Sequence, residues 1–392
     1  MFEKTRIAIL IICLGLCAGL GAHYLLDKES GILVERPVSI KIPEGGVQTD
    51  KFGIRLFQAA METVPGDSCM VCPFLVSETL LTLKELANDS LRQDIEKLGI
   101  GDYLAEHAAA PNMSMALAAD YGLFSSDEQN HEHILRLPFR SDLPMAMSLF
   151  NGALGLDGIG KHSVIIGSDF LTRDTKFIAG LYADYTPKMQ PHFLASDSIV
   201  SEFENANGSL PKVCMLRLRA NIRYAKATNG DWEAVAILLK PDHPAEGDPV
   251  AFMAILPTRR AEIMAAALTA EQLGTIRKAL AEATPSDCCV ELPQMRWSLP
   301  THNLESLLRN MGLGRLFDIT ENNWTFTERK LGLDAMAEKI GITLTHEQRI
   351  NGQQTGVDNA ATKISFNRPF IWLIGDLTTA TPAYYIGLVQ NL

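Results

Sequence analysis

The end of the chain constrains the fold more than any other segment. Phe366–Leu392 reads "FNRPFIWLIGDLTTATPAYYIGLVQNL", two apolar runs of strand length on either side of a Thr-rich turn. The runs are rich in aromatic and β-branched residues without strict alternation, which is typical of strands covered on both faces. We therefore expect a buried C-terminal β-hairpin. A terminus buried in this way must pair with strands that come much earlier in the chain.

The order of the remaining segments predicts an α+β fold. Helical patterns come first, in "DKFGIRLFQAAMETV" and "CPFLVSETLLTLKELAND", and "HSVIIGSDFL" is expected to form a strand in mid-chain. Short strands then dominate in "CMLRLRANIRYAKA", "WEAVAILLK", "VAFMAILP" and "CCVELPQMRWS", interrupted by a helix at "TAEQLGTIRKALAEA". Helices followed by strands, without βαβ alternation, favour α+β. The 392 residues, 47% of them apolar, suffice for one large domain, which we expect over residues 50–392.

The N-terminus predicts export. Lys4 and Arg6 precede Ile7–Leu26, an uncharged run long enough to cross a bilayer as a helix. We expect residues 1–26 to anchor the protein in a membrane, with the domain outside the cytoplasm and residues 27–49 as a connector. The alternative is a cleaved signal peptide and a secreted protein.

Charge and motifs exclude several classes of function. The net charge is −11 and no basic block lies outside the N-terminus, so nucleic acid is not an expected partner. Nucleophile-elbow, Walker and zinc-protease motifs are absent from the sequence, and we predict no enzyme and no catalytic, cofactor-binding or metal-binding residue. Cys69 and Cys72 have CxxC spacing, but no second Cys or His pair at zinc spacing accompanies them, so these two and the adjacent Cys288 and Cys289 are expected to be buried structural residues. With Cys214, the cysteines outside the N-terminal run form an odd set that cannot all pair within one chain.

The motifs, taken in order, resemble the serpin family. "FGIRLFQ" and "CMVCPFLVSETL" are similar to the family's opening helix, buried strand and second helix. "PKVCMLRLRANIRYA", "FMAILP", "VELPQM", "LESLLRNMGLGRLFD" and "FNRPFIWLIGD" with "YYIGLVQNL" resemble its later signatures. The resemblance covers residues 52–392. It implies a serpin-like fold with N-terminal helices, a large central mixed sheet and the C-terminal hairpin.

The resemblance also implies a function for the segment before the hairpin. Serpins expose a reactive loop there as bait for a serine or cysteine protease, and the cleaved loop enters the central sheet as a new strand. The implied function is inhibition of a serine-type or cysteine endopeptidase, with the loop at about residues 346–365. The implied loop and hinge residues are Gly356, Val357, Asp358, Asn359, Ala360, Ala361, Thr362 and Lys363.

Two registers of this loop remain open. In the first, "HEQRINGQQTGVDNAAT" is the family's strand and hinge, with His346 at the strand histidine and Gly356 at the hinge glycine. Only nine residues then separate Gly356 from Phe366. At about 3.3 Å per residue they are too few for both an inserted strand and a bait loop.

In the second register "KIGITL" is the strand before the loop, and the loop is close to normal length. Arg349, Asn351 and Gln353 then take inward positions, where an unpaired Arg is costly. The family's serines near the second helix are replaced by Cys72 and Leu75, and its Asn-Ala-aromatic-Phe strand is expected at "IGSDF". These differences support an alternative function, a non-inhibitory serpin-like binding or scaffold protein that is exposed at a membrane or secreted.

Overall fold

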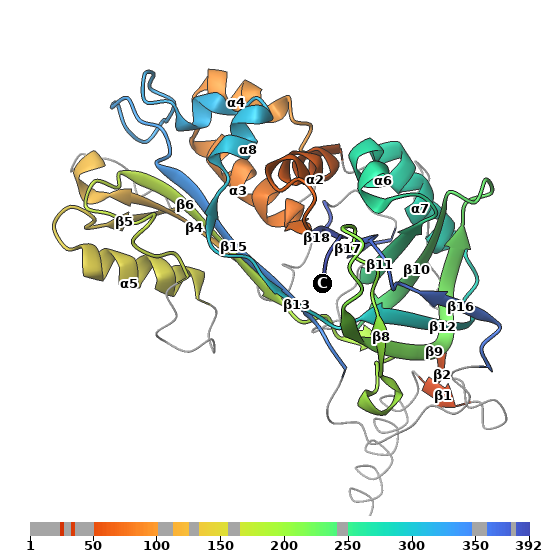
Figure 1. Cartoon of the computed structure of the whole chain (residues 1–392). Coiled ribbons are helices and arrows are strands. Elements are labelled where there is room, and N and C mark those ends of the chain that lie inside the picture. The colour runs from red at the N-terminus through yellow and green to blue at the C-terminus, as the bar shows by residue number, and fades with distance from the viewer. Residues whose placement is uncertain are drawn as a thin grey trace, which may run out of the picture.

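The structure is a computed structural model that describes residues 24–26, 33–35, 51–100, 113–124, 133–155, 165–240, 250–346, 359–377 and 382–392. Two β-sheets lie side by side within these residues, and helices cover them (Figure 1). The α-helices are α2 (Lys51–Thr63), α3 (Pro73–Leu86), α4 (Asp89–Glu96), α5 (Leu143–Leu154), α6 (Ala261–Ala267), α7 (Ala270–Glu282) and α8 (Glu305–Asn310). Short 3-10 turns are η2 (Tyr121–Leu123), η3 (Ala195–Asp197) and η4 (Gly314–Phe317). Three of the predicted helices, at α2, α3 and α7, are confirmed.

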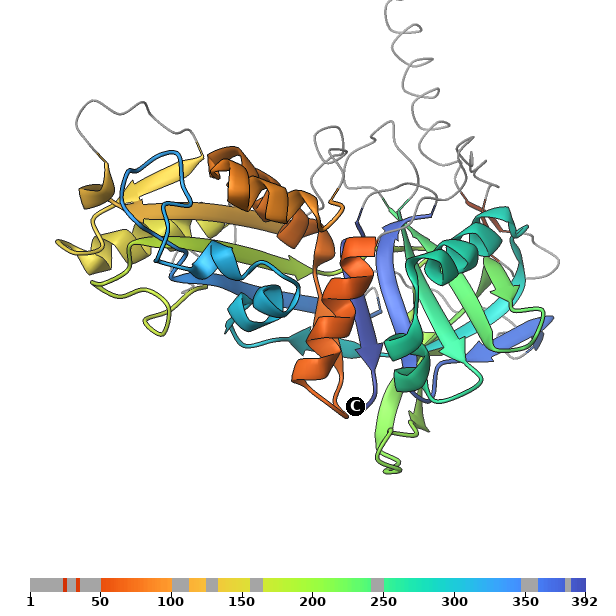
Figure 2. The same ribbon diagram turned by 90° about the horizontal axis from the view of Figure 1, so that it is seen from above.

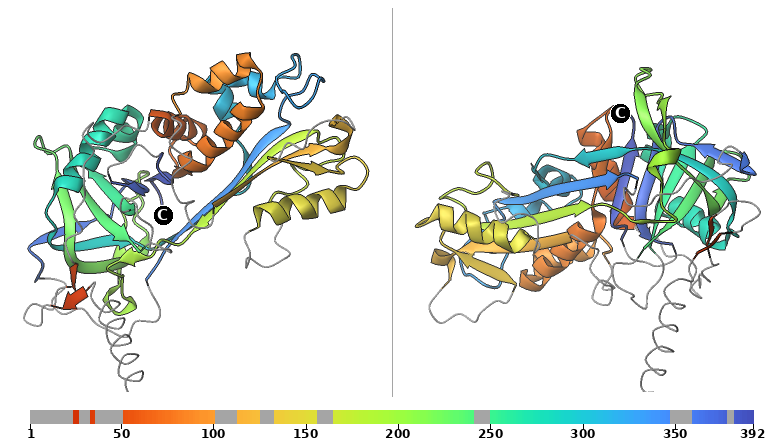
Figure 3. Two further views of the ribbon diagram at one scale, coloured as in Figure 1. Left: turned by 180° about the vertical axis from the view of Figure 1, so that it is seen from behind. Right: turned by 90° about the horizontal axis from the view of Figure 1, so that it is seen from below.

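The first sheet carries the strand that leads into the predicted loop. Its order is β13-β15-β6-β4-β5, and β14 pairs with β15. Helices α3 and α4 cover one face and α5 covers the other (Figures 1 and 3). Its strands are β4 (Met113–Asp120), β5 (Ile134–Leu137), β6 (Phe177–Tyr185), β13 (Met295–Ser298), β14 (His302–Asn303) and β15 (Ala335–Leu344).

The second sheet carries the other end of the predicted loop. Its central path is β1-β2-β9-β10-β11-β17-β18-β3, to which β7, β8, β12 and β16 add. Strand β16 lies at the end of the molecule opposite to β5 (Figure 2). Its strands are β1 (Tyr24–Leu26), β2 (Leu33–Glu35), β3 (Cys69–Val71), β7 (Met189–Gln190), β8 (Ile199–Glu202), β9 (Lys212–Lys226), β10 (Trp232–Leu239), β11 (Val250–Pro257), β12 (Ser286–Pro293), β16 (Thr362–Ser365), β17 (Phe370–Asp376) and β18 (Tyr385–Val389).

The C-terminal hairpin is confirmed as part of the core. Strands β17 and β18 are antiparallel, and every residue of both is buried. Strand β17 pairs with β11, and β18 pairs with β3, more than three hundred residues earlier in the chain. The hairpin therefore holds early and late segments in one sheet.

The strand expected at "HSVIIGSDFL" is not formed in its described part. Residues 165–171 make turns, in which the carbonyl of Gly167 accepts hydrogen bonds from the amides of Phe170 and Leu171. The side chain of Asn151, in α5, bonds to the amides of Ile165 and Ile166 and so takes the place of a partner strand. The sheet strand of this region is β6, "FIAGLYADY". The prediction was wrong because it relied on apolar content. Ile165 and Ile166 are buried against α5 in a turn, so their burial does not require a strand.

The predicted membrane anchor lies mostly outside the described residues. Its last three residues, Tyr24–Leu26, form β1 rather than the end of a helix, because they pair with Leu33–Glu35 of the expected connector. Strand β2 in turn meets β9 at Ala220. Among the described residues, no helix combines the length and the hydropathy that a bilayer crossing requires.

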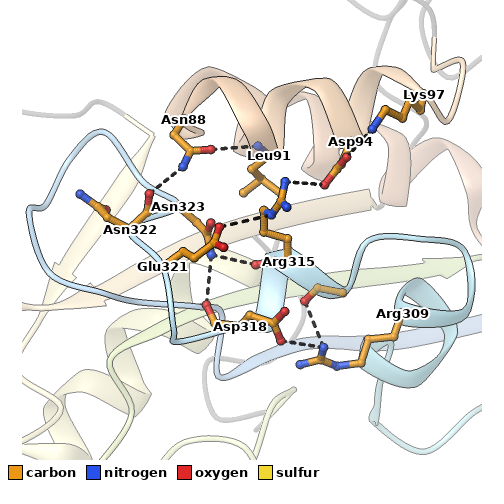
Figure 4. A network of polar contacts seen from close by, with 11 residues as sticks. Asn88, Leu91, Asp94, Lys97, Arg309, Arg315, Asp318, Glu321, Asn322 and Asn323 are labelled. Carbon is orange, nitrogen blue, oxygen red and sulfur yellow. Dashed lines mark hydrogen bonds and ion pairs between the residues drawn. The ribbon is translucent and has the colours of Figure 1, made fainter.

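A polar network fixes the segment that precedes β15 (Figure 4). The Asn88 side chain caps α4 and donates a hydrogen bond of 2.6 Å to the carbonyl of Asn322. The side-chain Nδ2 of the fully buried Asn323 donates to the carbonyls of Arg315 and Asp318 at 2.9 and 3.0 Å. These hydrogen bonds hold Asn322 and Asn323 against the start of α4 and against η4, in the segment that leads to β15.

Candidate functional site

The predicted loop residues connect the two sheets. Strand β15 ends at Leu344 and β16 begins at Thr362, so residues 345–361 form the connection. Gly356, Val357 and Asp358 lie outside the described residues. Of the other five, Asn359 and Ala361 are exposed and Ala360 is half-buried, while Thr362 and Lys363 belong to β16. The structure therefore places the last two predicted loop residues in a strand.

Strand β16 is held against β12 in a parallel ladder. Thr362 lies opposite Cys288 and Lys363 lies opposite Cys289, both of which are buried and free, as expected of structural cysteines. Ile364 is buried in the main hydrophobic core, and Phe366, just beyond the strand, is fully buried. The C-terminal end of the loop is thus anchored in the core.

A first ion pair reinforces this anchor at the start of β16. Asp287 of β12 accepts two hydrogen bonds from Arg219 of β9, of 2.9 Å from Nε and 2.8 Å from Nη2. Asp287 Oδ2 also accepts from the backbone amide of Ala361 at 3.3 Å. The hydrogen bonds from Arg219 hold the pKa of Asp287 below its ordinary value, against the effect of burial. Asp287 therefore links a buried arginine to the last residue before β16.

A second ion pair lies four residues further along β12. Glu291 Oε1 is 3.1 Å from Nε of Arg217, and these two residues are 7% and 8% exposed. The Nζ of Lys363 lies 3.4 Å from the same oxygen. Each carboxylate of β12 therefore contacts one arginine of β9 and one group of the loop's C-terminal end. We call Arg217, Arg219, Asp287 and Glu291 the anchor cluster.

The anchor cluster was not predicted from the sequence. A signal was present, because "RLR" in β9 and "DCCVE" in β12 place charged residues at even spacing in otherwise apolar strands. Even spacing puts such residues on one face of each strand. What the sequence did not show was that β9 and β12 are neighbours, which brings the two faces together.

The other end of the loop leaves from a seam between two parallel strands. Strands β15 and β6 pair directly in parallel, from Ala335 opposite Ile178 to Ile342 opposite Tyr185. Lys339–Leu344, the "KIGITL" segment, lies within β15, and His346 follows the end of the strand. The "KIGITL" segment is thus a strand, as the second register requires, while residues 347–358, which the first register uses, lie outside the described residues.

One acidic side chain lies in the middle of this seam. Glu338 is opposite Leu181 of β6 and opposite His302 of β14, and it is 1% exposed. Its Oε2 is 3.4 Å from Nε2 of His302. Cys72, which replaces a family serine, is also fully buried here, and burial together with the charge of Glu338 raises the pKa of its thiol.

The comparisons with known proteins agree with this architecture. The family model "Serpin (serine protease inhibitor)" matches residues 160–391. The chain is 13% identical to serpin-12 of Manduca sexta, covering 88% of this chain and 98% of that one, with a TM-score of 0.69. Maspin is 13% identical (87% and 97% covered, TM-score 0.71), and uncleaved ovalbumin is 15% identical (87% and 98%, TM-score 0.69). No curated protein sequence matches the chain.

The solved structures establish the fold and the family model establishes the relationship. At these identities structural similarity shows the architecture alone, and it confirms the α+β serpin-like fold with a large mixed sheet. The match of the family model extends over more than half of the chain, from before β6 to the end of the C-terminal hairpin. The chain therefore belongs to the serpin family.

Proposed function

We propose that this serpin inhibits a serine or cysteine protease by presenting residues 345–361 as bait. The protease's hydroxyl or thiol attacks the carbonyl carbon of one loop peptide bond, the C–N bond breaks, and the amine leaves with a proton. The acyl group stays on the protease as an ester or thioester. The freed N-terminal part of the loop then inserts between β6 and β15 before water can hydrolyse this bond.

The parallel seam between β6 and β15 is the observation that carries the proposal. A chain that leaves the C-terminal end of β15 and folds back runs antiparallel to both strands. Its insertion replaces one parallel ladder by two antiparallel ladders, which are the more stable arrangement for each residue. The closed seam is therefore an arrangement in which cleavage of the loop gives access to a more stable sheet.

The length of the connection supports the same mechanism. Strand β15 has ten residues, and seventeen residues, 345–361, separate it from β16. At about 3.3 Å per residue the connection extends to roughly 56 Å, against roughly 33 Å for β15. A cut near Asn359–Ala361 therefore releases enough chain for a turn and an added strand. Lys363 is an unfavourable cleavage site by comparison, because it lies in β16 and pairs with Cys289 of β12.

Covalent trapping tests this proposal. The full chain is incubated with a panel of serine and cysteine proteases, and the products are separated under denaturing conditions and identified by intact mass. We expect a complex whose mass equals that of the protease plus the chain up to the cut, less one water. The control is the same protease with its nucleophile blocked beforehand. Cleavage at residues 357–361 without any such complex would contradict inhibition.

A second candidate function, a non-inhibitory serpin-like binding or scaffold protein, is supported by polar residues along the insertion path. Arg349, Asn351 and Gln353 take inward positions in the second register, and Glu338 already occupies the seam as a buried acid. Replacing Arg349 by Thr and both Asn351 and Gln353 by Ala distinguishes the candidates. Complex formation that is gained only in this triple variant would show that the natural loop does not insert.

The setting in which such a protein acts follows from its N-terminus. We infer export, because Lys4 and Arg6 precede a long uncharged run. Fractionation of the expressing cells, with N-terminal sequencing of the recovered protein, tests this inference. Recovery in the cytoplasm with an intact Met1 would contradict it.

A further inference from the structure

The seam between β6 and β15 contains a charge that is poorly compensated. Neither carboxylate oxygen of Glu338 has a hydrogen-bond partner among the described residues. The only ion-pair contact that the described residues give it is with His302, at 3.4 Å. A buried carboxylate without a counter-charge is strongly unfavourable. The protonation state of His302 therefore affects the stability of the pairing between β6 and β15.

The other groups that face Glu338 cannot supply a positive charge. Cys72, the residue just before α3, and Tyr385 of β18 both lie within range of the charge of Glu338. Burial, followed by nearby negative charges that include Glu338, raises the pKa of both groups well above the ordinary values. Leu181 faces it from β6 and is apolar. His302 of β14 is therefore the one group facing Glu338, among those described, that can become cationic.

The neighbouring charged residues of the two strands point to the other face of the sheet. Successive side chains in a strand alternate between faces. Lys339 follows Glu338 in β15 and lies opposite Tyr182, and Asp184 lies opposite Gly341. Tyr182 packs with the core under α5, whereas Leu181 packs with the core under α2 and α3. Lys339 and Asp184 are consequently separated from Glu338 by the sheet itself.

The geometry of His302 favours its charged form. Its Nε2 faces Oε2 of Glu338, and its Nδ1 lies 3.3 Å from the carbonyl oxygen of Pro300. Nε2 lies within ion-pair distance of a carboxylate oxygen and Nδ1 lies beside a carbonyl oxygen, so both neighbours favour a proton on each ring nitrogen, which makes the ring a cation. Its side chain is 39% exposed, so the ring exchanges protons with solvent. Burial lowers the pKa of His302, but contact with Glu338 and the Pro300 carbonyl outweigh it, and the pKa is raised overall.

We propose that His302 and Glu338 form a pH-sensitive lock on the seam between β6 and β15. The protonated ring compensates the buried carboxylate and holds the strands together. When the ring loses its proton, the carboxylate is left uncompensated, and separation of β15 from β6 becomes easier because it admits water to the charge.

The direction of the pH effect follows from the sign of the shift. A histidine whose pKa is raised in the folded state stabilises the fold, and this stabilisation is fully present at pH values below the pKa of the histidine in the unfolded chain. That stability is lost as pH rises through the folded pKa. The seam therefore weakens from acidic toward neutral and alkaline pH. This conclusion concerns the uncleaved protein and holds whether or not the loop inserts.

Hydrogen exchange of the uncleaved full chain tests the lock. Protection factors, corrected for the intrinsic pH dependence of exchange, are measured for peptides that cover β6 and β15 at about pH 5.5 and about pH 8.5. Peptides that cover β9 and β12 serve as the internal reference. We expect the protection of the seam relative to the reference to fall by about threefold or more at the higher pH.

Three variants complete the test. Glu338→Gln and His302→Gln should each abolish the pH dependence, because each leaves no charge pair to titrate. His133→Gln is the matched control, since His133 lies at the same 3.4 Å from Glu85 but on the surface, and it should behave like the wild type. The lock is refuted if seam and reference change in parallel, or if the pH dependence persists in Glu338→Gln.

Discussion

Nζ of Lys363 lies 3.4 Å from Oε1 of Glu291, the same oxygen that contacts Arg217. Lys363 is the second residue of β16, so this contact fixes the point at which the chain leaves the loop and re-enters the sheet. The C-terminal end of the loop is thus held by the ion pair between Lys363 and Glu291 as well as by the backbone pairing of β16 with β12. If the anchor cluster stabilises the fold, changing its residues should lower the free energy of unfolding.

Replacing Asp287 by Asn should destabilise the protein by about 2–3 kcal/mol, because it leaves Arg219 buried without its carboxylate. Denaturant unfolding measures the change. The matched control is Glu282→Gln, which breaks an exposed pair with Lys278 and should change the free energy of unfolding by less than about 0.5 kcal/mol. Equal effects of the two substitutions would show that the anchor cluster adds no stability.

The contribution of Asp287 should disappear in acid. Its pKa is lowered in the folded protein, so its stabilisation is present above the unfolded value of about 3.9 and is lost as pH falls through the folded pKa. The difference in unfolding free energy between wild type and Asp287→Asn should stay constant at about pH 5–7 and shrink below about pH 4. Denaturant unfolding at several pH values checks this. A difference that is the same across the whole range would contradict the assignment.

The C-terminal hairpin should be intolerant of one added methyl group. A Cβ at Gly387 would lie 2.5 Å from ring atoms of Trp372, which is fully buried and stacks on Phe252. Gly387→Ala should therefore cost about 3 kcal/mol through overpacking. In the partner strand, a Cβ at Gly375 would come no closer than 3.4 Å to its neighbours, Ala383 and Tyr384, so Gly375→Ala should cost far less. Similar losses in chemical denaturation would contradict this account of the packing.

Local sequence patterns predicted much of the fold. The aromatic and branched runs identified the C-terminal hairpin, and the spacing of apolar residues identified α2, because burial on both faces and burial on one helix face leave different periodicities. The strand expected at "IGSDF" was wrong. The Asn151 side chain, from α5, accepts hydrogen bonds from the backbone amides of Ile165 and Ile166 where a partner strand would otherwise bind. Such a side-chain interaction leaves no local periodicity.

The candidate site was predicted only in part. Motif order placed the predicted loop before the C-terminal hairpin, but the sequence left two registers open because it did not show where β15 ends, at Leu344, or where β16 begins, at Thr362. Glu338 gave no signal in sequence, because an acidic residue in an apolar strand does not reveal what it faces. Its contact with His302 exists only because β14 pairs with β15. The anchor cluster likewise depends on strand neighbours that are far apart in the chain.

The stability of the protein after a single cut in the loop tests the central claim most directly. A broad-specificity protease is used to cut one bond between residues 357 and 361, the site is confirmed by intact mass, and the thermal unfolding midpoint is compared with that of the uncut chain. Insertion between β6 and β15 should raise the midpoint by about 10 °C or more, since each kcal/mol shifts the midpoint of a large domain by about 2 °C. An unchanged or lower midpoint in the cut protein would show that the loop does not insert, and would contradict inhibition by this mechanism.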